Sequence, residues 1–261
     1  MRSYFLAGLF AATAVSATPA AAISINDLSW DLAGCVGAAA CTIDGVDLTA
    51  QPGGSTFTEQ NDGAGVIGLG VNSTGDDGSG SPGNEIQGRF GEMMSLDFGA
   101  GASITDFSIA FFFNPDEFPG SNEPEEVAIF EFTFTDNTTT SISVLNSTNA
   151  GDGFEITDDD FATSVQSSGD SAEIVGSIRA TRTSTDAGIF EFDNLFGTAV
   201  VSSLVLKTAD DLVDGTTEGS DYALLTLNAD PAVTVVPVPA ALPLLLGGLA
   251  GLGIVGRRRK A

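Results

Sequence analysis

Several stretches of the chain alternate apolar and polar residues with a period of two. The clearest contains Phe130, Phe132 and Phe134, which are separated by Glu131 and Thr133. Such a period places alternate side chains on opposite faces of a β-strand, so one face is buried and the other is solvated. The same alternation occurs around three further sets of residues: Phe107, Ile109, Phe111 and Phe113; Ile142 and Val144; and Phe190 and Phe192.

Turn-forming residues separate these stretches from further candidate strands. Clusters of Gly, Asn, Asp and Pro bound the segments 95–98, 154–157, 172–182, 199–207 and 222–228. Residues 51–85 are rich in Gly, Ser and Asp, and we expect one short strand there, at 66–71, inside long loops. No convincing amphipathic helix occurs in the body of the chain. We therefore predict an all-β fold, an antiparallel β-sandwich of jelly-roll type.

The aromatic rows have two interpretations. Each buried Phe side chain contributes roughly 2–3 kcal/mol of transfer free energy, so a row of them would supply much of a core between two sheets. The alternative is an exposed platform on which sugar rings stack. We expect the first, because the Phe residues occupy the apolar side of each alternation.

The N-terminus is typical of an export signal. Arg2 precedes an apolar run over residues 4–15, and the small residues Ala20 and Ala22 fit a cleavage site, so the mature chain would begin at Ile23. Export implies the Sec machinery and an oxidising compartment. The only two cysteines, Cys35 and Cys41, are therefore expected to form a disulfide.

The charge of the chain excludes some partners. All 35 acidic residues lie between the leader and the C-terminal segment, with only four basic ones: Arg89, Arg179, Arg182 and Lys207. Such a body repels nucleic acid and anionic membrane surfaces. It favours divalent cations, although an acidic surface without a specific ligand is the simpler interpretation.

Oxygen-bearing side chains suggest calcium as a possible cofactor. Asp76, Asp77 and Glu85 lie in one flexible segment, and Asp193 ends a predicted strand. Calcium takes six to eight oxygen ligands, but the spacing matches no EF-hand loop. The alternatives are a solvated loop for the first three and a simple turn for Asp193-Asn194.

Residues 236–261 combine three features in a fixed order. An apolar run over 238–255 would reach about 27 Å as a helix, enough to cross a thin bilayer. The cations after it predict that this end stays cytoplasmic. The motif before and overlapping the run is Val236, Pro237, Val238, Pro239 and Ala240, and the closing basic cluster is Arg257, Arg258, Arg259 and Lys260.

This tail resembles the sorting signal of the PEP-CTERM family, in the variant whose motif reads VPLPA. The resemblance implies a Gram-negative bacterium and an exosortase-type membrane protease that cuts near the Pro motif, often beside exopolysaccharide systems. An unprocessed membrane anchor is the alternative. The expected organisation is a signal peptide (1–22), a β-sandwich ectodomain (23–228), a linker (229–235) and the sorting tail (236–261).

Three functions remain open. The chain contains no His, which excludes Ser-His-Asp and Cys-His catalysis and His-ligated metals. We expect a non-enzymatic structural or adhesive protein that is anchored in the inner membrane with its ectodomain in the periplasm, and then moves to the cell surface or medium after processing. A calcium-assisted module that binds exopolysaccharide is the alternative. A hydrolase built on carboxylates ranks below both, because 35 acids form suitable pairs by chance.

Overall fold

A computed structural model of the chain describes residues 21–61, 65–73, 85–88, 91–111, 126–146, 165–169, 177–181, 189–208 and 221–232. The first twenty residues of the expected signal peptide, Asp76, Asp77, the strand expected at 154–157 and the whole of the expected sorting tail lie outside these residues. Among the described residues, no helix combines the length and the apolar character needed to cross a bilayer.

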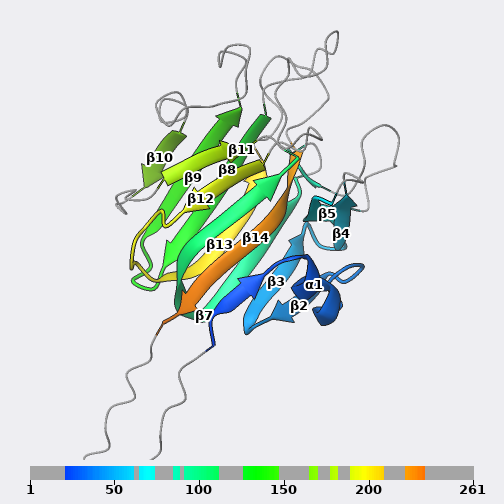
Figure 1. Cartoon of the computed structure of the whole chain (residues 1–261), viewed down its shortest axis with the longest axis horizontal. Coiled ribbons are helices and arrows are strands. Elements are labelled where there is room, and N and C mark those ends of the chain that lie inside the picture. Colours follow the sequence, from blue (N-terminus) through cyan, green and yellow to red (C-terminus); the bar gives the residue numbers. More distant parts are fainter. Residues whose placement is uncertain are drawn as a thin grey trace, which may run out of the picture. The chain divides into compact units, whose positions relative to one another are not determined.

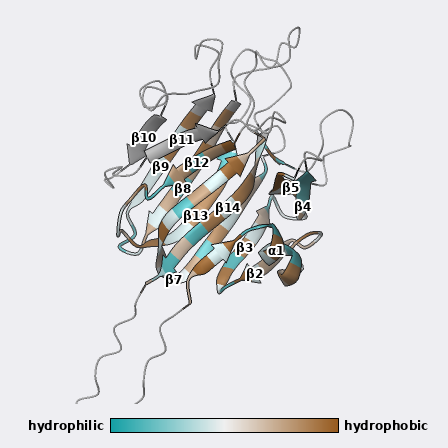
Figure 2. Cartoon of the chain, viewed as in Figure 1, coloured by the Kyte–Doolittle hydropathy of each residue, from teal (hydrophilic) through white to brown (hydrophobic). Residues whose placement is uncertain are grey.

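The fold is all-β, as predicted, and the described strands pair antiparallel (Figure 1). Alternating hydropathy along the long central strands is visible in Figure 2. The strands are β1 (Ile23–Ile25), β2 (Ala40–Ile43), β3 (Val46–Gln51), β4 (Thr56–Asn61), β5 (Ile67–Asn72), β6 (Ile86–Gln87), β7 (Met93–Ala110), β8 (Glu126–Phe134), β9 (Thr139–Asn146), β10 (Val165–Gly169), β11 (Ser177–Thr181), β12 (Ile189–Asp193), β13 (Val201–Thr208) and β14 (Asp221–Pro231).

Strand β7 joins two layers of strands. Its first part, from Met93 to Asp97, pairs with β3 and β13, and that layer continues through β8 and β9 to β10. Its second part, from Ala102 to Ala110, pairs with β14 and β12. Strand β11 flanks β12, whereas β1, β5 and β6 pair with β14. One strand therefore belongs to both layers.

The passage between layers requires glycine. Gly99 and Gly101 have φ values of 58° and 96°, in the left-handed region that side chains with a Cβ rarely adopt. At Gly101 a Cβ would also lie 2.6 Å from Val200 Cγ1 and 2.7 Å from Thr135 Cγ2. The segments 95–98 and 107–113, predicted as separate strands, therefore both belong to β7 up to Ala110, because the glycines between them bend the strand instead of ending it.

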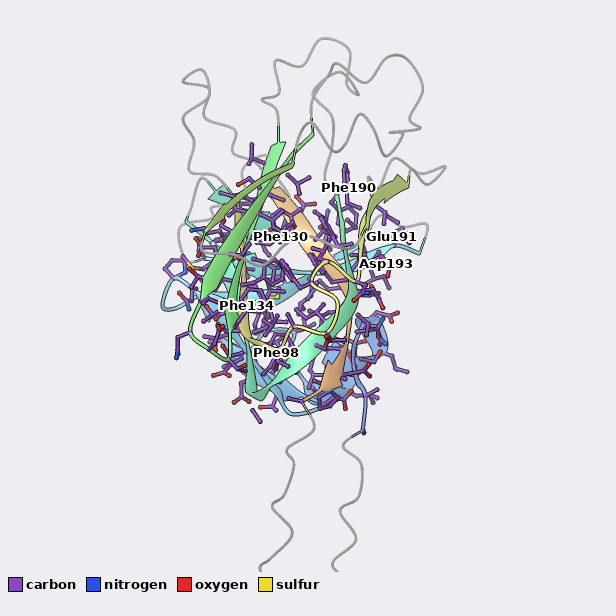
Figure 3. All side chains as sticks on the ribbon, turned by 90° about the vertical axis from the view of Figure 1, so that its left-hand side faces the viewer. Phe98, Phe130, Phe134, Phe190, Glu191 and Asp193 are labelled. Carbon is purple, nitrogen blue, oxygen red and sulfur yellow. A yellow bond between two sulfur atoms is a disulfide. The ribbon has the colours of Figure 1, made fainter. Side chains whose placement is uncertain are left out.

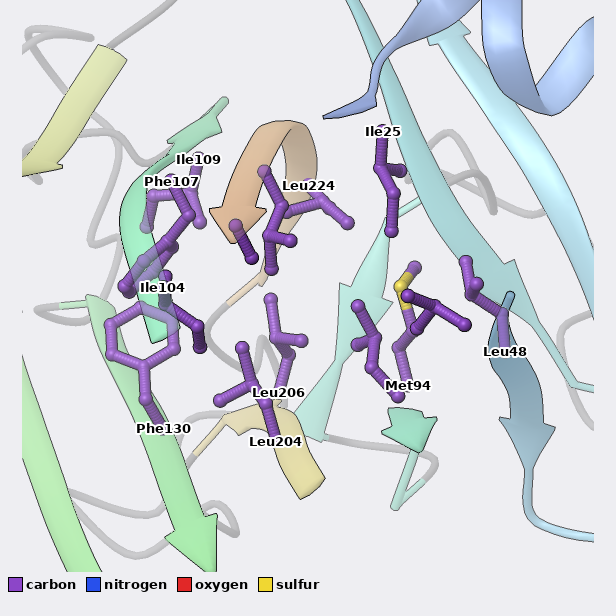
Figure 4. Close-up of a cluster of buried hydrophobic side chains, with 14 of the residues drawn as sticks. Ile25, Leu48, Met94, Ile104, Phe107, Ile109, Phe130, Leu204, Leu206 and Leu224 are labelled. Carbon is purple, nitrogen blue, oxygen red and sulfur yellow. The ribbon is translucent and has the colours of Figure 1, made fainter. Parts of the chain in front are cut away.

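The core between the layers is aromatic. Phe107 of β7 stacks on Phe192 of β12, with ring centroids 4.3 Å apart and an interplanar angle of 5°. Phe130 of β8 meets both rings edge-on, at 5.1 and 4.9 Å. Leu204, Leu206 and Leu224 fill the space beside them (Figure 4). The prediction that the Phe rows form the core is confirmed for the described residues, where each Phe of these rows is buried; Phe113 lies outside them.

A tight turn joins β8 to β9. Asn137 adopts a φ of 67°, and Asp136 accepts hydrogen bonds from the hydroxyl and the backbone N–H of Thr138, at 2.6 and 2.9 Å. These bonds lower the pKa of Asp136, and the bond from the Thr138 hydroxyl has the larger effect. The turn sets the register that leaves Ile142 and Val144 buried.

A short helix corrects the expectation that the body contains none. Helix α1 (Asp27–Ala33) follows β1 directly and buries Trp30. Asn26 and Ser29 form a reciprocal capping box at its start, and Gly34 ends it with a φ of 68°. Seven residues are too few to display a 3.6-residue period, so only the caps could have predicted this helix.

Three strand boundaries also differ from the predictions. Residues 51–85 contain two complete strands where one was expected, since β4 pairs with β5; β4 buries only Phe57 and shows no alternation. Strand β7 ends before Phe111, whose φ of 65° is incompatible with a strand. Strand β14 continues to Pro231, which pairs with Ala102. The first three residues of the expected linker therefore belong to the sheet.

Candidate functional site

A patch of polar side chains covers the outward face of β12, β7 and β14. The pairing register aligns Asp193, Asp106 and Asn228 in one row across these strands. A second row contains Glu191, Ser108 and Thr226. We call these six residues the outer polar grid. In Figure 3 Glu191 and Asp193 lie on one side of the molecule, away from Phe130 and Phe134.

Two irregularities in the β7–β14 ladder shape the grid. The register shifts between Leu224 and Thr226 and again between Asn228 and Ala229, where Thr105 lacks a counterpart. Each shift turns a polar residue outward while the next apolar residue stays in the core. Bulges of this kind are common beside functional sites because they re-aim side chains.

Hydrogen bonds hold part of the grid in place. Asn228 Nδ2 donates to Asp106 Oδ1 at 2.7 Å, and the Thr105 hydroxyl lies 3.1 Å from Asp106 Oδ2. The hydroxyls of Ser108 and Thr226 are bonded to each other at 2.7 Å. The centre of the grid is therefore held by hydrogen bonds among its own side chains.

A hollow of about 260 Å³ lies over the grid, lined by Asp106, Ser108, Glu191, Asp193 and Thr226, with Phe107 and Phe192 also contributing. Three of these residues are carboxylates, and Asp193 faces Asp106 directly across the ladder. Carboxylates accept hydrogen bonds and donate none when ionised. The hollow suits a ligand that offers several hydroxyl or ammonium donors.

The calcium residues predicted from the sequence do not meet in one site. Asp76 and Asp77 lie outside the described residues. Glu85 is buried beside β6, which pairs with β14 at Asp221 and Tyr222, whereas Asp193 belongs to the row of Asn228. On β14 the two pairings are six residue steps apart, from Tyr222 to Asn228, or roughly 20 Å. Within the described part of the chain, no three Asp, Glu, Cys or His residues are arranged to hold a metal.

The cysteine prediction is confirmed. Cys35 and Cys41 form a disulfide with a Cα–Cα distance of 5.2 Å. It connects the turn after α1 to β2, and Cys35 is buried. Its place in the fold is structural.

The outer polar grid was not predicted from the sequence. Asp106 and Ser108 alternate with Phe107, and Glu191 alternates with Phe190 and Phe192, so the alternation indicates the polar side of each strand. The partners on β14 could not be identified from the sequence, because more than 110 residues separate Ser108 from Thr226. No protein-family model matches the chain, and no curated protein or solved structure shows significant similarity to it.

Proposed function

We propose that this chain is an exported protein of the bacterial cell envelope or extracellular matrix, with a structural or adhesive role and no enzymatic activity. In this proposal an exosortase-type protease recognises the tail. The supporting observation is that the first and last strands pair: Ile23 lies opposite Ala229 in an antiparallel register. The expected cleavage point after Ala22 and the end of β14, the last described strand, are thus at the same end of one strand pair.

This pairing suits a domain that is held by its C-terminus. Strand β14 pairs with β7 on one side and with β1, β5 and β6 on the other, so tension on residue 232 acts on a strand bonded along both edges. Ile23 and Ile25 are buried, and the strand formed by the expected mature N-terminus secures the last strand. Residues 232–235 would span at most about 13 Å, which keeps the domain near the membrane before processing.

The aromatic residues favour the structural role over the alternative. Every aromatic side chain whose burial is described lies in the core, Trp30 and Tyr222 included. A saccharide would therefore have to bind the described surface through hydrogen bonds alone.

The two layers support the assignment as a β-sandwich, and the jelly-roll type stays a prediction.

Deletion of residues 257–260 in the producing bacterium tests the sorting proposal. We expect the variant to accumulate as an unprocessed precursor of correspondingly higher mass, because the cations define the topology that the protease requires. Replacing the body cation Lys207 with Gln is the matched control and should leave processing unchanged. Normal processing of the deletion variant would refute the sorting proposal.

The second candidate, saccharide binding, is favoured by the hollow over the outer polar grid. The probe is exopolysaccharide purified from the producing strain. Retention that requires Asp106 and Asp193 would support this candidate. Equal elution of the wild type and the Asp193→Ala variant, with and without calcium, would remove it.

A further inference from the structure

Two like charges face each other on the outer polar grid. Asp193 of β12 lies directly opposite Asp106 of β7, and side chains paired in this way have Cβ atoms about 4.5–5.5 Å apart. Like charges in such a position destabilise a sheet. A protein that keeps them gives up stability, which is typical of residues that serve binding instead of folding.

Neighbouring residues fix one of these carboxylates and leave the other without a partner. Asp106 accepts a hydrogen bond from Asn228 Nδ2 at 2.7 Å and another from the Thr105 hydroxyl at 3.1 Å, and both donors are neutral. In the part of the chain that the structure describes, no group donates a hydrogen bond to the exposed side chain of Asp193. The charge of the pair is therefore not balanced by any cation among these residues.

The register of β11 separates Glu191 from this pair. Arg179 lies opposite Glu191 in the ladder, whereas the neutral Ser177 lies opposite Asp193. A basic residue thus accompanies Glu191 but not Asp193. The unbalanced charge beneath the hollow is centred on Asp193 and Asp106.

Apolar side chains border the grid on the same face of the sheet. Alternate residues of a strand share a face, so Ala110 lies on the side of Ser108. By the same rule Ile189 lies on the side of Glu191. Ala110 belongs to an apolar cluster separate from the main core, against which Ile189 and Leu225 pack while partly exposed. We call Ala110, Ile189 and Leu225 the apolar row.

We propose that the hollow binds an amino sugar, whose protonated amine lies between Asp106 and Asp193. This inference rests on the saccharide candidate above and names the class of sugar. An ammonium group donates hydrogen bonds and supplies the positive charge that the facing carboxylates lack. Hydroxyls of the same ring reach the bonded pair Ser108 and Thr226, and the C–H face of an adjoining ring covers the apolar row.

Size and charge disfavour other occupants. The hollow of about 260 Å³ has the volume of roughly nine water molecules, which a sugar ring fills and a single ammonium group does not. A metal ion needs several converging ligands, and the described residues contain no group of three acidic or thiol side chains arranged in that way. Uronic acids carry a negative charge that the same carboxylates repel.

The test titrates the purified full chain, in detergent, with trimers of glucosamine, N-acetylglucosamine and glucuronic acid. Calorimetry at about pH 6, where carboxylates are ionised and amino sugars protonated, measures the affinities. We expect the glucosamine trimer to bind at least tenfold more tightly than its acetylated form, and the glucuronic acid trimer not to bind. A lysine tripeptide should bind at least tenfold more weakly than the glucosamine trimer.

Variants locate the site. Asp193→Asn should weaken glucosamine binding at least tenfold without lowering the melting temperature, because it relieves the like-charge pair. Asp31→Asn is the matched control: it removes an exposed carboxylate on α1 and should change the affinity less than twofold. Wild-type affinity in Asp193→Asn, or equal affinity for glucosamine and the tripeptide, would overturn the inference.

The result also separates this inference from the proposals on which it rests. Equal binding of the free and acetylated trimers that Asp193→Asn abolishes would refute the role of the amine and leave the saccharide candidate in place. Failure of all three trimers to bind would refute the amino-sugar inference. The sorting proposal is measured by processing of the tail and does not depend on either outcome.

Discussion

The two faces of strands β7 and β12 differ in almost every property. On the inner face Phe107 and Phe192 stack at 4.3 Å and pack against β8. On the outer face Asp106 and Asp193 lie opposite each other beneath an open hollow. The inner residues determine stability through desolvation and packing, whereas the outer ones are ordered by a few hydrogen bonds. One strand thus carries the core and a candidate binding surface in alternate positions.

The largest effect is expected on the inner face. Phe107→Ala removes a ring that contacts three other Phe rings and leaves a cavity, so the free energy of unfolding should fall by about 3–5 kcal/mol. Urea denaturation followed by fluorescence measures this loss. A loss below about 1 kcal/mol would mean that the inner face is not the main source of stability.

The bend of β7 is the next most sensitive position, because both faces depend on it. Gly101→Ala should lower the free energy of unfolding by roughly 1–3 kcal/mol through backbone strain and the close contacts with Val200 and Thr135. Gly99→Ala is the control: its Cβ would meet nothing within 4 Å, so only about 1 kcal/mol is expected. Equal losses in the two variants would show that the close contacts do not matter.

A buried hydroxyl gives a smaller effect that depends on pH. Tyr222→Phe removes the bond that the hydroxyl donates to the Lys207 carbonyl at 2.9 Å, at a cost of about 1 kcal/mol. Burial raises the pKa of Tyr222 well above its usual value. The unfolded chain therefore loses this proton near pH 10 while the folded chain keeps it, so stability should fall as the pH rises above about 10.

Denaturation of both proteins between pH 8 and 11 measures that slope. The Phe variant should show a shallower fall than the wild type. Parallel curves would indicate that Tyr222 reaches solvent and ionises in the folded state.

The smallest effect is expected on the outer face. Asp193→Asn removes one of two like charges that face each other across the ladder, so stability should change by no more than about 0.5 kcal/mol, upward rather than downward. The midpoint of urea denaturation checks this. A clear loss of stability would contradict this prediction, because it would show that the Asp193 carboxylate stabilises the folded state.

The sequence predicted the elements with strong alternation and missed those without it. Strands β8, β9 and β12 were recognised from their Phe, Ile and Val residues. Strand β4 buries a single residue, and α1 has only seven residues, fewer than two full helical turns. Neither element therefore shows a periodic pattern of apolar residues. The continuity of β7 was also missed, because its glycines indicate a turn when read locally.

The candidate sites divide in the same way. The disulfide was predictable, since the chain has only two cysteines and export to an oxidising compartment was expected. The outer polar grid was not predictable, because its members come from segments that only the folded sheet brings together.

The sequence by itself determined which side of each strand is apolar, because alternation is a local property of the extended chain. It also determined the all-β class and the pairing of the cysteines. Only the tertiary structure decided which strands are neighbours, where β7 bends and which polar residues share a surface. Those choices depend on long-range register, and the shifts near Thr105 and Leu225 alter that register in ways that a local pattern cannot specify.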